Sequence, residues 1–595
     1  MVSIVLGSEF RKEDSYTKRT THATLFEIQR ETSLKIDCLP KLIYIHRNPI
    51  SGAFMPTDKD LQSIQEARDL VNKAKEAQLA FRNTTQEKVD AVVKAMVDAG
   101  FAAAEKLGKM AHEETGFGKP ADKKKKNEFA TQRVWESIKD LKTVGVINDD
   151  KEKRIIEIAE PMGVVAALIP STNPTSTVIF KAIISVKGRN GFVASPHPRA
   201  VNCTLEATRI IAQAAESAGA PAGLISCMSV PSIEGTNELM KHRKTAVILA
   251  TGSNPMVRAA YSSGKPAYGV GSGNVPAFIE RTANVKKAVA DIISGKMFDW
   301  GVLCSTESGV IVDEPIKRMA IDEFKKRGGY FCSPEEKDRL SRTMFDPRGA
   351  INPDIVGKPP QFIAQKAGFE VPSDTTCLIA ELPAIGKEYP LSREKLSPVL
   401  SMFTVNGYRE GCEMCIEMLQ FGGIGHTMVI HCTDPEIVLK FGLEKPAFRV
   451  LVNTQAALGA VGYTNELLPS MTLGPGTFGG SIISENVSAK HLINIKRLAF
   501  ETRPINPPEQ FMSKTPAPPK TELPRATMYH MSTAPSGKSW IDEIDERIRL
   551  KASNVLSPTS KPEAKQVAAE VKKQASYGTG ITEEQVEKIL KEFKK

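Results

Sequence analysis

Apolar positions between residues 162 and 263 alternate between short continuous runs and longer stretches that repeat every three to four residues. Short apolar runs bounded by small residues are typical of buried strands, and the periodic stretches are typical of helices packed on them. The expected strands are 162–169, 191–195, 224–230 and 245–250, and the expected helices are 175–186, 199–218, 234–242 and 255–263. This alternation predicts an α/β fold with a parallel sheet, helices on both faces, and ligand binding outside the carboxyl ends of the strands.

The pattern changes on both sides of this block. Residues 61–140 are mainly helical in pattern, whereas 1–54 show no clear periodicity. Either Met55 is the true start of the protein, or residues 1–54 are a loosely attached extension. A second alternating block covers about 284–461. Residues 503–535 contain eight prolines, which excludes helix interiors and central strands and indicates an extended linker.

Two short amphipathic segments follow the linker. The first begins near Ser539, and the second begins with a capping box formed by Thr582 and Gln585. Apolar residues of the second segment share one helical face: Val586, Ile589, Leu590 and Phe593. Because so short a helix is marginal alone in water, we expect it to fold on a partner. Docking back onto its own chain is the alternative.

Composition and charge exclude several classes. The chain has 595 residues, 25% charged and 41% hydrophobic, which is ordinary for a globular enzyme, and its net charge of +10 is spread out. The one dense basic run, Lys123–Lys126, lies in a helical pattern and is interpreted as a solvated face, so nucleic-acid binding is not expected. Neither a signal peptide nor an apolar run long enough to span a membrane is seen, and the nine cysteines form no disulfide framework. A cytoplasmic protein with reduced thiols is expected.

Metal binding is not expected. Cys412 and Cys415 form a CxxC pair in a helical pattern without a second pair nearby. His112-Glu113-Glu114 lacks the second histidine of a HExxH site.

Cys304 is the candidate nucleophile. It lies among small and polar residues just before the apolar run 308–312, where a thiolate can attack a carbonyl and hold an acyl group as a thioester. A buried core cysteine is the alternative. Asn173 follows the first strand, and its side-chain amide can stabilise an oxyanion together with the Cys304 backbone N–H, or it can cap the following helix. His426, in a glycine-rich loop, can tune or deprotonate a thiol, although a lone histidine is often structural.

Gly252 and Ser253 end the fourth strand, where a pyrophosphate can approach a helix N-terminus. This signal is weak alone, because a true GxGxxG is absent: the glycine-rich segment 269–273 does not open a helix.

Several motifs in register resemble one family. They are 169–177, Phe180-Lys181, 195–200, 260–264, 271–276, 394–398, 425–427 and 484–487. Over about residues 58–502 the chain resembles the CoA-acylating aldehyde dehydrogenases of the aldehyde dehydrogenase superfamily, particularly the propionaldehyde dehydrogenases of bacterial microcompartments associated with glycyl-radical enzymes. The resemblance implies an aldehyde dehydrogenase-like fold with two doubly wound α/β domains and an oligomerisation β-hairpin.

The resemblance also implies roles for single residues. Cys304 would be the nucleophile, Asn173 the oxyanion donor, and His426 an assistant in the thiol chemistry of coenzyme A. NAD would lie with its pyrophosphate near Gly252 and Ser253, its adenosine near Ser195 and Pro198, and its nicotinamide ribose near Glu394. Further implied cofactor-binding residues are Pro170, Ser171, Thr172, Val270 and Gly271.

One missing residue distinguishes two chemistries. Hydrolytic members of the superfamily carry a glutamate near the glycine-rich segment, whereas here no carboxylate occurs from Gly269 until Glu280. Without that base water attacks a thioester poorly, which favours transfer to the thiol of coenzyme A. A hydrolytic dehydrogenase and a catalytically idle scaffold subunit remain the alternatives.

The resemblance implies a domain order: an extension (1–55), an NAD-binding domain (56–280), a catalytic domain (281–461), a return to the NAD-binding and oligomerisation region (462–502), a linker (503–577) and an encapsulation helix (578–595). The implied substrate is propionaldehyde or acetaldehyde, and no metal is implied. The implied partners are microcompartment shell proteins, bound through residues 578–595, and a second copy or four copies of the chain, paired through strands near 151–160 and 488–500. The implied location is a microcompartment in the bacterial cytoplasm. Since the tail is linker and helix, an iron-dependent alcohol dehydrogenase half is not expected.

Overall fold

The computed structural model describes residues 58–506. The predictions for residues 1–54, for most of the linker, for the segment near Ser539 and for the helix at 578–595 lie outside these residues. Within the described part, no helix combines the length and the apolar character that a membrane span requires.

The first domain contains a five-stranded parallel sheet, and the strand prediction is largely confirmed. Its order is β5 (Ile225–Cys227), β4 (Gly191–Pro196), β3 (Val164–Ile169), β6 (Thr245–Thr251) and β7 (Ala267–Val270). Every residue of β3 is buried, as expected for a central parallel strand covered on both faces. The strand expected at 224–230 is shorter, and that expected from 162 begins at 164, because the chain before it belongs to another sheet.

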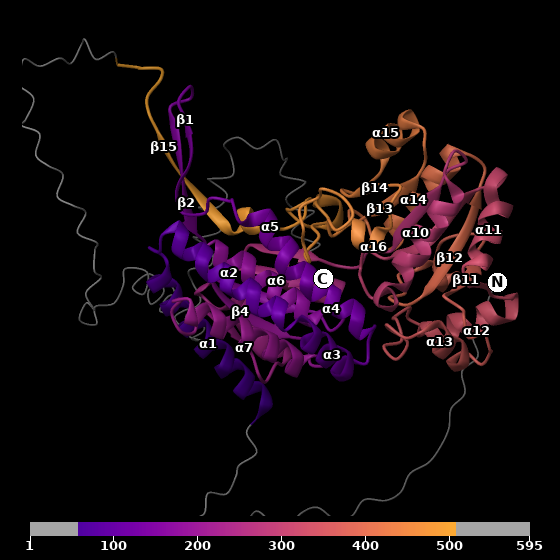
Figure 1. Ribbon diagram of the computed structural model, residues 1–595, viewed down its shortest axis with the longest axis horizontal. Coiled ribbons are helices and arrows are strands. Elements are labelled where there is room, and N and C mark those ends of the chain that lie inside the picture. The colour runs from indigo at the N-terminus through magenta and orange to yellow at the C-terminus, as the bar shows by residue number, and fades with distance from the viewer. Residues whose placement is uncertain (1–57, 507–595) are drawn as a thin grey trace, which may run out of the picture. The chain divides into compact units, whose positions relative to one another are not determined.

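Alternate residues of β3 pack on different helices. Val165 and Ala167 belong to a core cluster with α6 (Pro174–Lys187) and α7 (Val201–Ser217). Val164 and Ala166 pack with α1 (Lys59–Phe81), α8 (Ile233–Lys241) and α9 (Asn254–Tyr261). The remaining N-terminal helices are α2 (Gln86–Ala102), α3 (Ala104–Thr115), α4 (Pro120–Glu128) and α5 (Val134–Ile138), with a π-helical turn, Phe129–Arg133, between the last two (Figure 1).

The second domain contains a seven-stranded parallel sheet. Its order is β10 (Gly329–Phe331), β11 (Cys377–Glu381), β12 (Val399–Val405), β9 (Glu307–Asp313), β8 (Val275–Ile279), β13 (Met428–His431) and β14 (Val450–Val452). Side chains on one face pack with α10 (Val285–Met297), α11 (Lys317–Lys326) and α16 (Ala456–Gly459). Those on the other pack with α12 (Pro334–Met344), α13 (Pro360–Lys366), α14 (Tyr408–Gly422) and α15 (Pro435–Glu444). The expected boundary at residue 280 would put β8 in the first domain, whereas β8 pairs inside this sheet.

A third sheet is antiparallel and joins distant parts of the chain. The hairpin of β1 (Gly145–Asp150) and β2 (Ile155–Pro161) pairs with β15 (Ile493–Ala499), and Ile155 faces Ala499 in the register (Figure 1). Ile495 and Leu498 remain exposed on β15, which pairs on one side only within the described residues. An exposed apolar edge strand suits the expected oligomerisation element.

The basic run Lys123–Lys126 differs from the prediction. The expected solvated face is wrong for Lys123 and Lys126, which are 2% and 4% exposed. Residues i and i+3 share a face of a helix, and here that face of α4 packs inward. Both ammonium groups pair with the carboxylate of Asp299, Lys123 at 3.2 Å.

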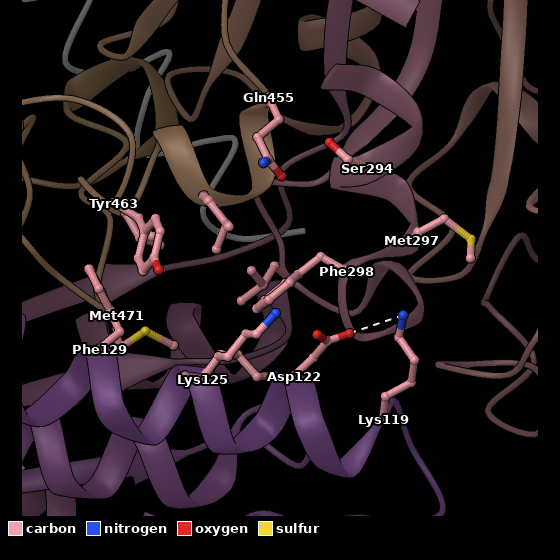
Figure 2. Close-up of a pocket in the computed structure, with 14 residues that line it drawn as sticks. Lys119, Asp122, Lys125, Phe129, Ser294, Met297, Phe298, Gln455, Tyr463 and Met471 are labelled. Atoms are coloured by element: carbon pink, nitrogen blue, oxygen red, sulfur yellow. Dashed lines mark ion pairs between the residues drawn. The ribbon is translucent and has the colours of Figure 1, made fainter. Parts of the chain in front are cut away.

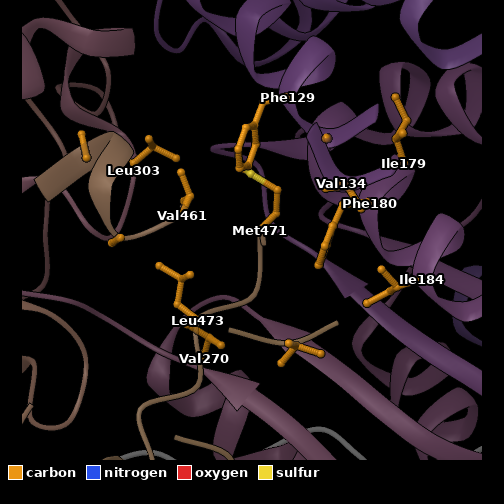
Figure 3. Close-up of a cluster of buried hydrophobic side chains, with 14 of the residues drawn as sticks. Phe129, Val134, Ile179, Phe180, Ile184, Val270, Leu303, Val461, Met471 and Leu473 are labelled. Atoms are coloured by element: carbon orange, nitrogen blue, oxygen red, sulfur yellow. The ribbon is translucent and has the colours of Figure 1, made fainter. Parts of the chain in front are cut away.

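One core cluster runs through both domains. Figure 3 shows Ile179, Phe180 and Ile184 of α6 on one side and Leu303 with Val461 on the other. Phe129 and Met471 lie between them. Leu303 precedes the candidate nucleophile, so the position of that loop is set by packing against elements of both domains.

Candidate active site

Cys304 lies on a loop between a short 3-10 turn, Phe298–Gly301, and β9. Asp299 and Trp300 have φ of 48° and 52°, in the left-handed region that non-glycine residues rarely adopt, so the chain turns sharply here. The side chain of Cys304 is partly exposed and lines a cavity of about 320 Å³. The cavity lies where the carboxyl ends of β3 and β6 face the amino ends of β8 and β9.

The cavity gathers most of the predicted site residues. Ten of them line it: Pro170, Ser171, Thr172, Asn173, Gly252, Ser253, Val270, Gly271, Cys304 and Glu394. Three do not. Ser195 is buried at the end of β4 with its hydroxyl 2.8 Å from that of Thr236, and Pro198 is exposed beyond the same strand, whereas the neighbouring His197 lines the cavity. His426 is buried and not among the lining residues.

The side chain of Asn173 bonds to Thr172 and Lys126 and does not cap a helix. It occupies the N-cap position of α6 but makes no capping hydrogen bond, so the capping alternative is wrong. Its Nδ2 donates to the hydroxyl of Thr172 at 3.1 Å, and its Oδ1 accepts from Nζ of Lys126 at 2.5 Å. Sequence reasoning missed Lys126, although its three-residue spacing from Lys123 was visible.

The surroundings of Cys304 favour the protonated thiol over the thiolate. Burial raises the pKa of Cys304 to about 12, and the carboxylate of Glu394 raises it further, whereas Arg449 and the backbone N–H groups of Cys304 and Ser305 lower it. Arg449 was also missed, and the signal available was a single cation at the start of the apolar run 450–452. A thiolate here therefore needs a change of environment, such as the arrival of a ligand near Glu394.

Gly273 connects Glu394 with the nucleophile. Its N–H donates to Oε1 of Glu394 at 2.8 Å. A Cβ at this position would lie 1.7 Å from the carbonyl oxygen of Cys304, so only glycine permits the two backbones to approach this closely.

His426 is buried beside this junction. Its Nδ1 lies 2.9 Å from the hydroxyl oxygen of Thr427, which also accepts from Nε of Arg449 at 3.3 Å. The hydroxyl has two lone pairs, so which group donates in the contact with Nδ1 depends on the tautomer of His426. Burial, with Arg449, holds the pKa of His426 well below its usual value. The lowered pKa favours a neutral imidazole, and the role of His426 in tuning or deprotonating a thiol stays a prediction.

A second cavity of about 420 Å³ adjoins the first. Leu303 of the second cavity precedes Cys304 of the first in the chain, and Lys126 of the second donates to Asn173 of the first. Its walls include apolar side chains from both domains: Phe129, Phe298, Leu458, Val461 and Met471. Figure 2 shows Phe129 and Met471 on one wall and Gln455 on the opposite one. A π-helical turn supplies Phe129, and such turns are frequent at functional sites.

Within residues 58–506, Glu280 is the first carboxylate after the glycine-rich segment, and it does not line the first cavity. Glu280 lies beyond the far end of the five-residue β8, about 16 Å along the strand from the Gly273 end. Its Oε2 accepts from the N–H and hydroxyl of Thr282. Among the described residues that line the first cavity, Glu394 is the one acid.

Comparison with known proteins places this geometry among enzymes of aldehyde oxidation. Residues 47–329 match the profile described as the aldehyde dehydrogenase family. The chain is 43% identical over 442 residues to the bifunctional aldehyde-alcohol dehydrogenase of Escherichia coli (strain K12), covering 73% of this chain and 50% of that protein. The chain thus spans about half the length of the first curated relatives it matches. It is 36% identical to the succinate-semialdehyde dehydrogenase (acetylating) of Clostridium kluyveri, covering 73% of this chain and 95% of that one.

Solved structures similar to this chain are also aldehyde dehydrogenases. An acetylating aldehyde dehydrogenase from Geobacillus thermoglucosidasius is 51% identical with a TM-score of 0.74, covering 76% of this chain and 99% of that one. A propionaldehyde dehydrogenase from the fucose utilisation microcompartment of Clostridium phytofermentans is 27% identical with a TM-score of 0.65, covering 73% and 97%. The expected α/β fold, with its two doubly wound domains, is therefore confirmed.

Proposed function

Because the chain belongs to the aldehyde dehydrogenase family, we propose that it oxidises propionaldehyde or acetaldehyde with NAD and passes the acyl group to coenzyme A. The observation that carries the proposal is the meeting of Cys304 and Asn173 in one cavity, at the carboxyl ends of β3 and β6. A nucleophile and an amide donor so placed suit the oxyanion of a thiohemiacetal.

The residues of the first cavity fit a dinucleotide. Ser253 makes no side-chain capping bond, so the backbone N–H groups of Asn254 and Met256 at the start of α9 are available to a pyrophosphate, whereas Pro255 between them has none. Gly252 and Gly271 line the same part of the cavity. Glu394 would reach the nicotinamide ribose, and NAD, when bound, supplies the hydride acceptor.

In the proposed reaction the Cys304 thiolate adds to the aldehyde carbonyl. The oxyanion accepts hydrogen bonds from Nδ2 of Asn173 and the backbone N–H of Cys304. Loss of hydride leaves an acyl group on Sγ, and the thiol of coenzyme A then takes that group and releases Cys304. His426 would donate a hydrogen bond during the exchange of sulfur atoms. The aldehyde would enter from the second cavity, whose apolar walls suit a short alkyl chain.

A kinetic survey of C2 to C4 aldehydes tests this proposal, with NADH followed by absorbance and acyl-CoA by mass spectrometry. We expect sustained NADH formation only with coenzyme A, and acyl-CoA in equal amount. Undiminished steady NADH formation without coenzyme A would instead establish the hydrolytic alternative. Running the survey with NADP in place of NAD determines the cofactor preference.

Substitution of the nucleophile tests the idle-scaffold alternative. Cys304→Ala should abolish turnover, and Cys332→Ala, which removes another partly exposed free thiol, should not. Equal activity of the wild type, Cys304→Ala and Cys332→Ala would support a scaffold subunit. Acyl-enzyme trapped by quenching should carry its label on Cys304.

We also propose that the protein acts as a homodimer or homotetramer in the bacterial cytoplasm, inside a microcompartment, with residues 578–595 bound to shell proteins. Support comes from the amphipathic face at 586–593, the exposed edge of β15 and the likeness to a microcompartment enzyme. Deleting residues 578–595 should preserve activity and abolish co-purification with shells. Shell association that survives the deletion would contradict this part, and light scattering determines the oligomeric state.

A further inference from the structure

The amide of Asn173 is oriented by a buried cation. Lysine ammonium groups only donate hydrogen bonds, so the atom of Asn173 that lies 2.5 Å from Nζ of Lys126 must be the oxygen. Nδ2 then faces the other way, where one N–H donates to Thr172 at 3.1 Å. The second N–H of this group has no partner among the described residues and belongs to a side chain that lines the cavity of Cys304.

Lys126 is itself held by the segment that leads to the nucleophile. Its ammonium pairs with Asp299, which is fully buried and also accepts from the N–H of Lys119 at 2.6 Å. The backbone N–H of Asp299 donates to Asp122 at 2.9 Å. Since Asp299 stands at the sharp turn five positions before Cys304, one network holds both the nucleophile loop and the oxyanion donor.

We propose that Lys126 is a positioning residue for aldehyde oxidation: its ammonium fixes Oδ1 of Asn173, so that the free N–H of Nδ2 faces the oxyanion formed on Cys304. The inference rests on the proposed function and adds a residue to it. Lys126 acts through Asn173 and does not take part in bond making. Its charge also polarises the amide, which strengthens the N–H as a donor.

The charge of Lys126 makes this role sensitive to pH. The pKa of Lys126 is lowered to about 8, chiefly by burial. Lys123 also lowers this pKa, whereas Asp299 and Asp122 raise it. A neutral amine can accept as well as donate, so above this pH the amide of Asn173 loses its fixed orientation. We expect kcat to fall on the alkaline side with an apparent pKa near 8.

A double-mutant cycle tests the inference, with the initial rate of NADH formation as readout. Asn173→Ala should lower kcat by about 10²–10³, the usual effect of losing one oxyanion donor. Lys126→Met should lower kcat by about 10- to 100-fold with little change in KM. The double variant should match Asn173→Ala alone, because Lys126 has nothing left to orient. Multiplicative losses in the double variant would overturn the inference.

Two further variants separate positioning from folding. Lys123→Met removes another buried cation from Asp299, one whose ammonium donates to the carbonyl of Thr172 and not to the amide of Asn173. It should lower the melting temperature, and because Lys123 lowers the pKa of Lys126, it should move the alkaline limb to higher pH without removing it. A loss of kcat as large as that of Lys126→Met would overturn the inference. Lys126→Arg keeps a cation that stays charged, so the limb should move to higher pH. An unchanged limb in Lys126→Arg would overturn the inference even where Lys126→Met fails to fold.

The rate of NADH formation tests the role of Lys126 independently of whether coenzyme A is the acyl acceptor. The cycle follows aldehyde oxidation itself, so it decides the role of Lys126 whether the acyl group passes to coenzyme A or to water. A hydrolytic result would therefore remove the coenzyme A proposal and leave this inference standing.

Discussion

Replacing Glu394 by glutamine should make Cys304 more reactive before any ligand binds. The carboxylate of Glu394 raises the pKa of the thiol, second only to burial. Glutamine keeps an oxygen to accept from the Gly273 N–H, so the loop geometry is retained while the negative charge is removed. The variant thus isolates the electrostatic effect.

The magnitude follows from the pKa of about 12. Compared with a free cysteine at about 8.5, the thiolate fraction at pH 7 is about 3000-fold smaller. A more basic thiolate is more nucleophilic, with a Brønsted coefficient of about 0.4–0.5, which returns about 1.5 of the 3.5 log units. Alkylation of Cys304 should therefore be about 100-fold slower than that of a free cysteine, and each unit by which the pKa falls should raise the rate about threefold.

The assay is labelling by iodoacetamide, read at Cys304 by peptide mass spectrometry from pH 7 to 9.5. The wild-type rate should rise throughout without a plateau, and Glu394→Gln should be faster at each pH. Glu388→Gln, which removes an exposed acid from the same loop, should match the wild type. A wild-type plateau near pH 8.5, or equal rates in Glu394→Gln, would refute this account of the thiol.

Three further predictions concern other positions. Gly273→Ala should lower kcat by about 100-fold or more, because its Cβ would lie 1.7 Å from the carbonyl oxygen of Cys304, whereas Gly442→Ala, where nothing lies within 4 Å, should keep wild-type activity. Asn190→Ala should lower the free energy of unfolding, read from urea midpoints, by on the order of 3 kcal/mol, because the side chain accepts from two backbone N–H groups and donates to two carbonyls; an unchanged midpoint would contradict this. Burial raises the pKa of Glu307 to about 7, above its unfolded value, so the stability it contributes is present below about pH 4.5 and is lost as the pH rises through 7. Glu307→Gln should therefore gain in melting temperature relative to the wild type between pH 5 and pH 8, by an amount that corresponds to at most about 3 kcal/mol; parallel curves would count against it.

The sequence predicted those features whose physical cause lies in neighbouring residues of the chain. Strand β3 was found within two residues because six consecutive buried positions leave a continuous apolar run. The grouping of Asn173 and Gly252 followed from the rule that parallel strands present their carboxyl ends at one edge. By contrast, the burial of Lys126 depends on Asp299, 173 positions away, and no pattern within one helix reveals such a partner.

The same reasoning explains why His426 and Ser195 do not line the cavity of Cys304. His426 was predicted to tune or deprotonate a thiol because it lies in a glycine-rich loop, whereas burial and Arg449 lower its pKa. Ser195 stands at the right strand end, yet its hydroxyl is 2.8 Å from that of Thr236 and does not line the cavity. Chemical identity and position along a strand were readable, whereas the direction of a side chain depends on neighbours from other elements.

The placement of carboxylates around Cys304 bears on the fate of the acyl group. Activation of water needs a base within hydrogen-bonding reach of the thioester. Glu280 is separated from this site by the length of β8, and its Oε2 is engaged by Thr282. Glu394, the one acid among the described residues of the first cavity, accepts from the Gly273 N–H and would meet the ribose when a dinucleotide is bound. A thioester on Cys304 would therefore persist after hydride loss until a second thiol arrives, and exchange of one thioester for another costs little free energy, so the proposed reaction should run in both directions.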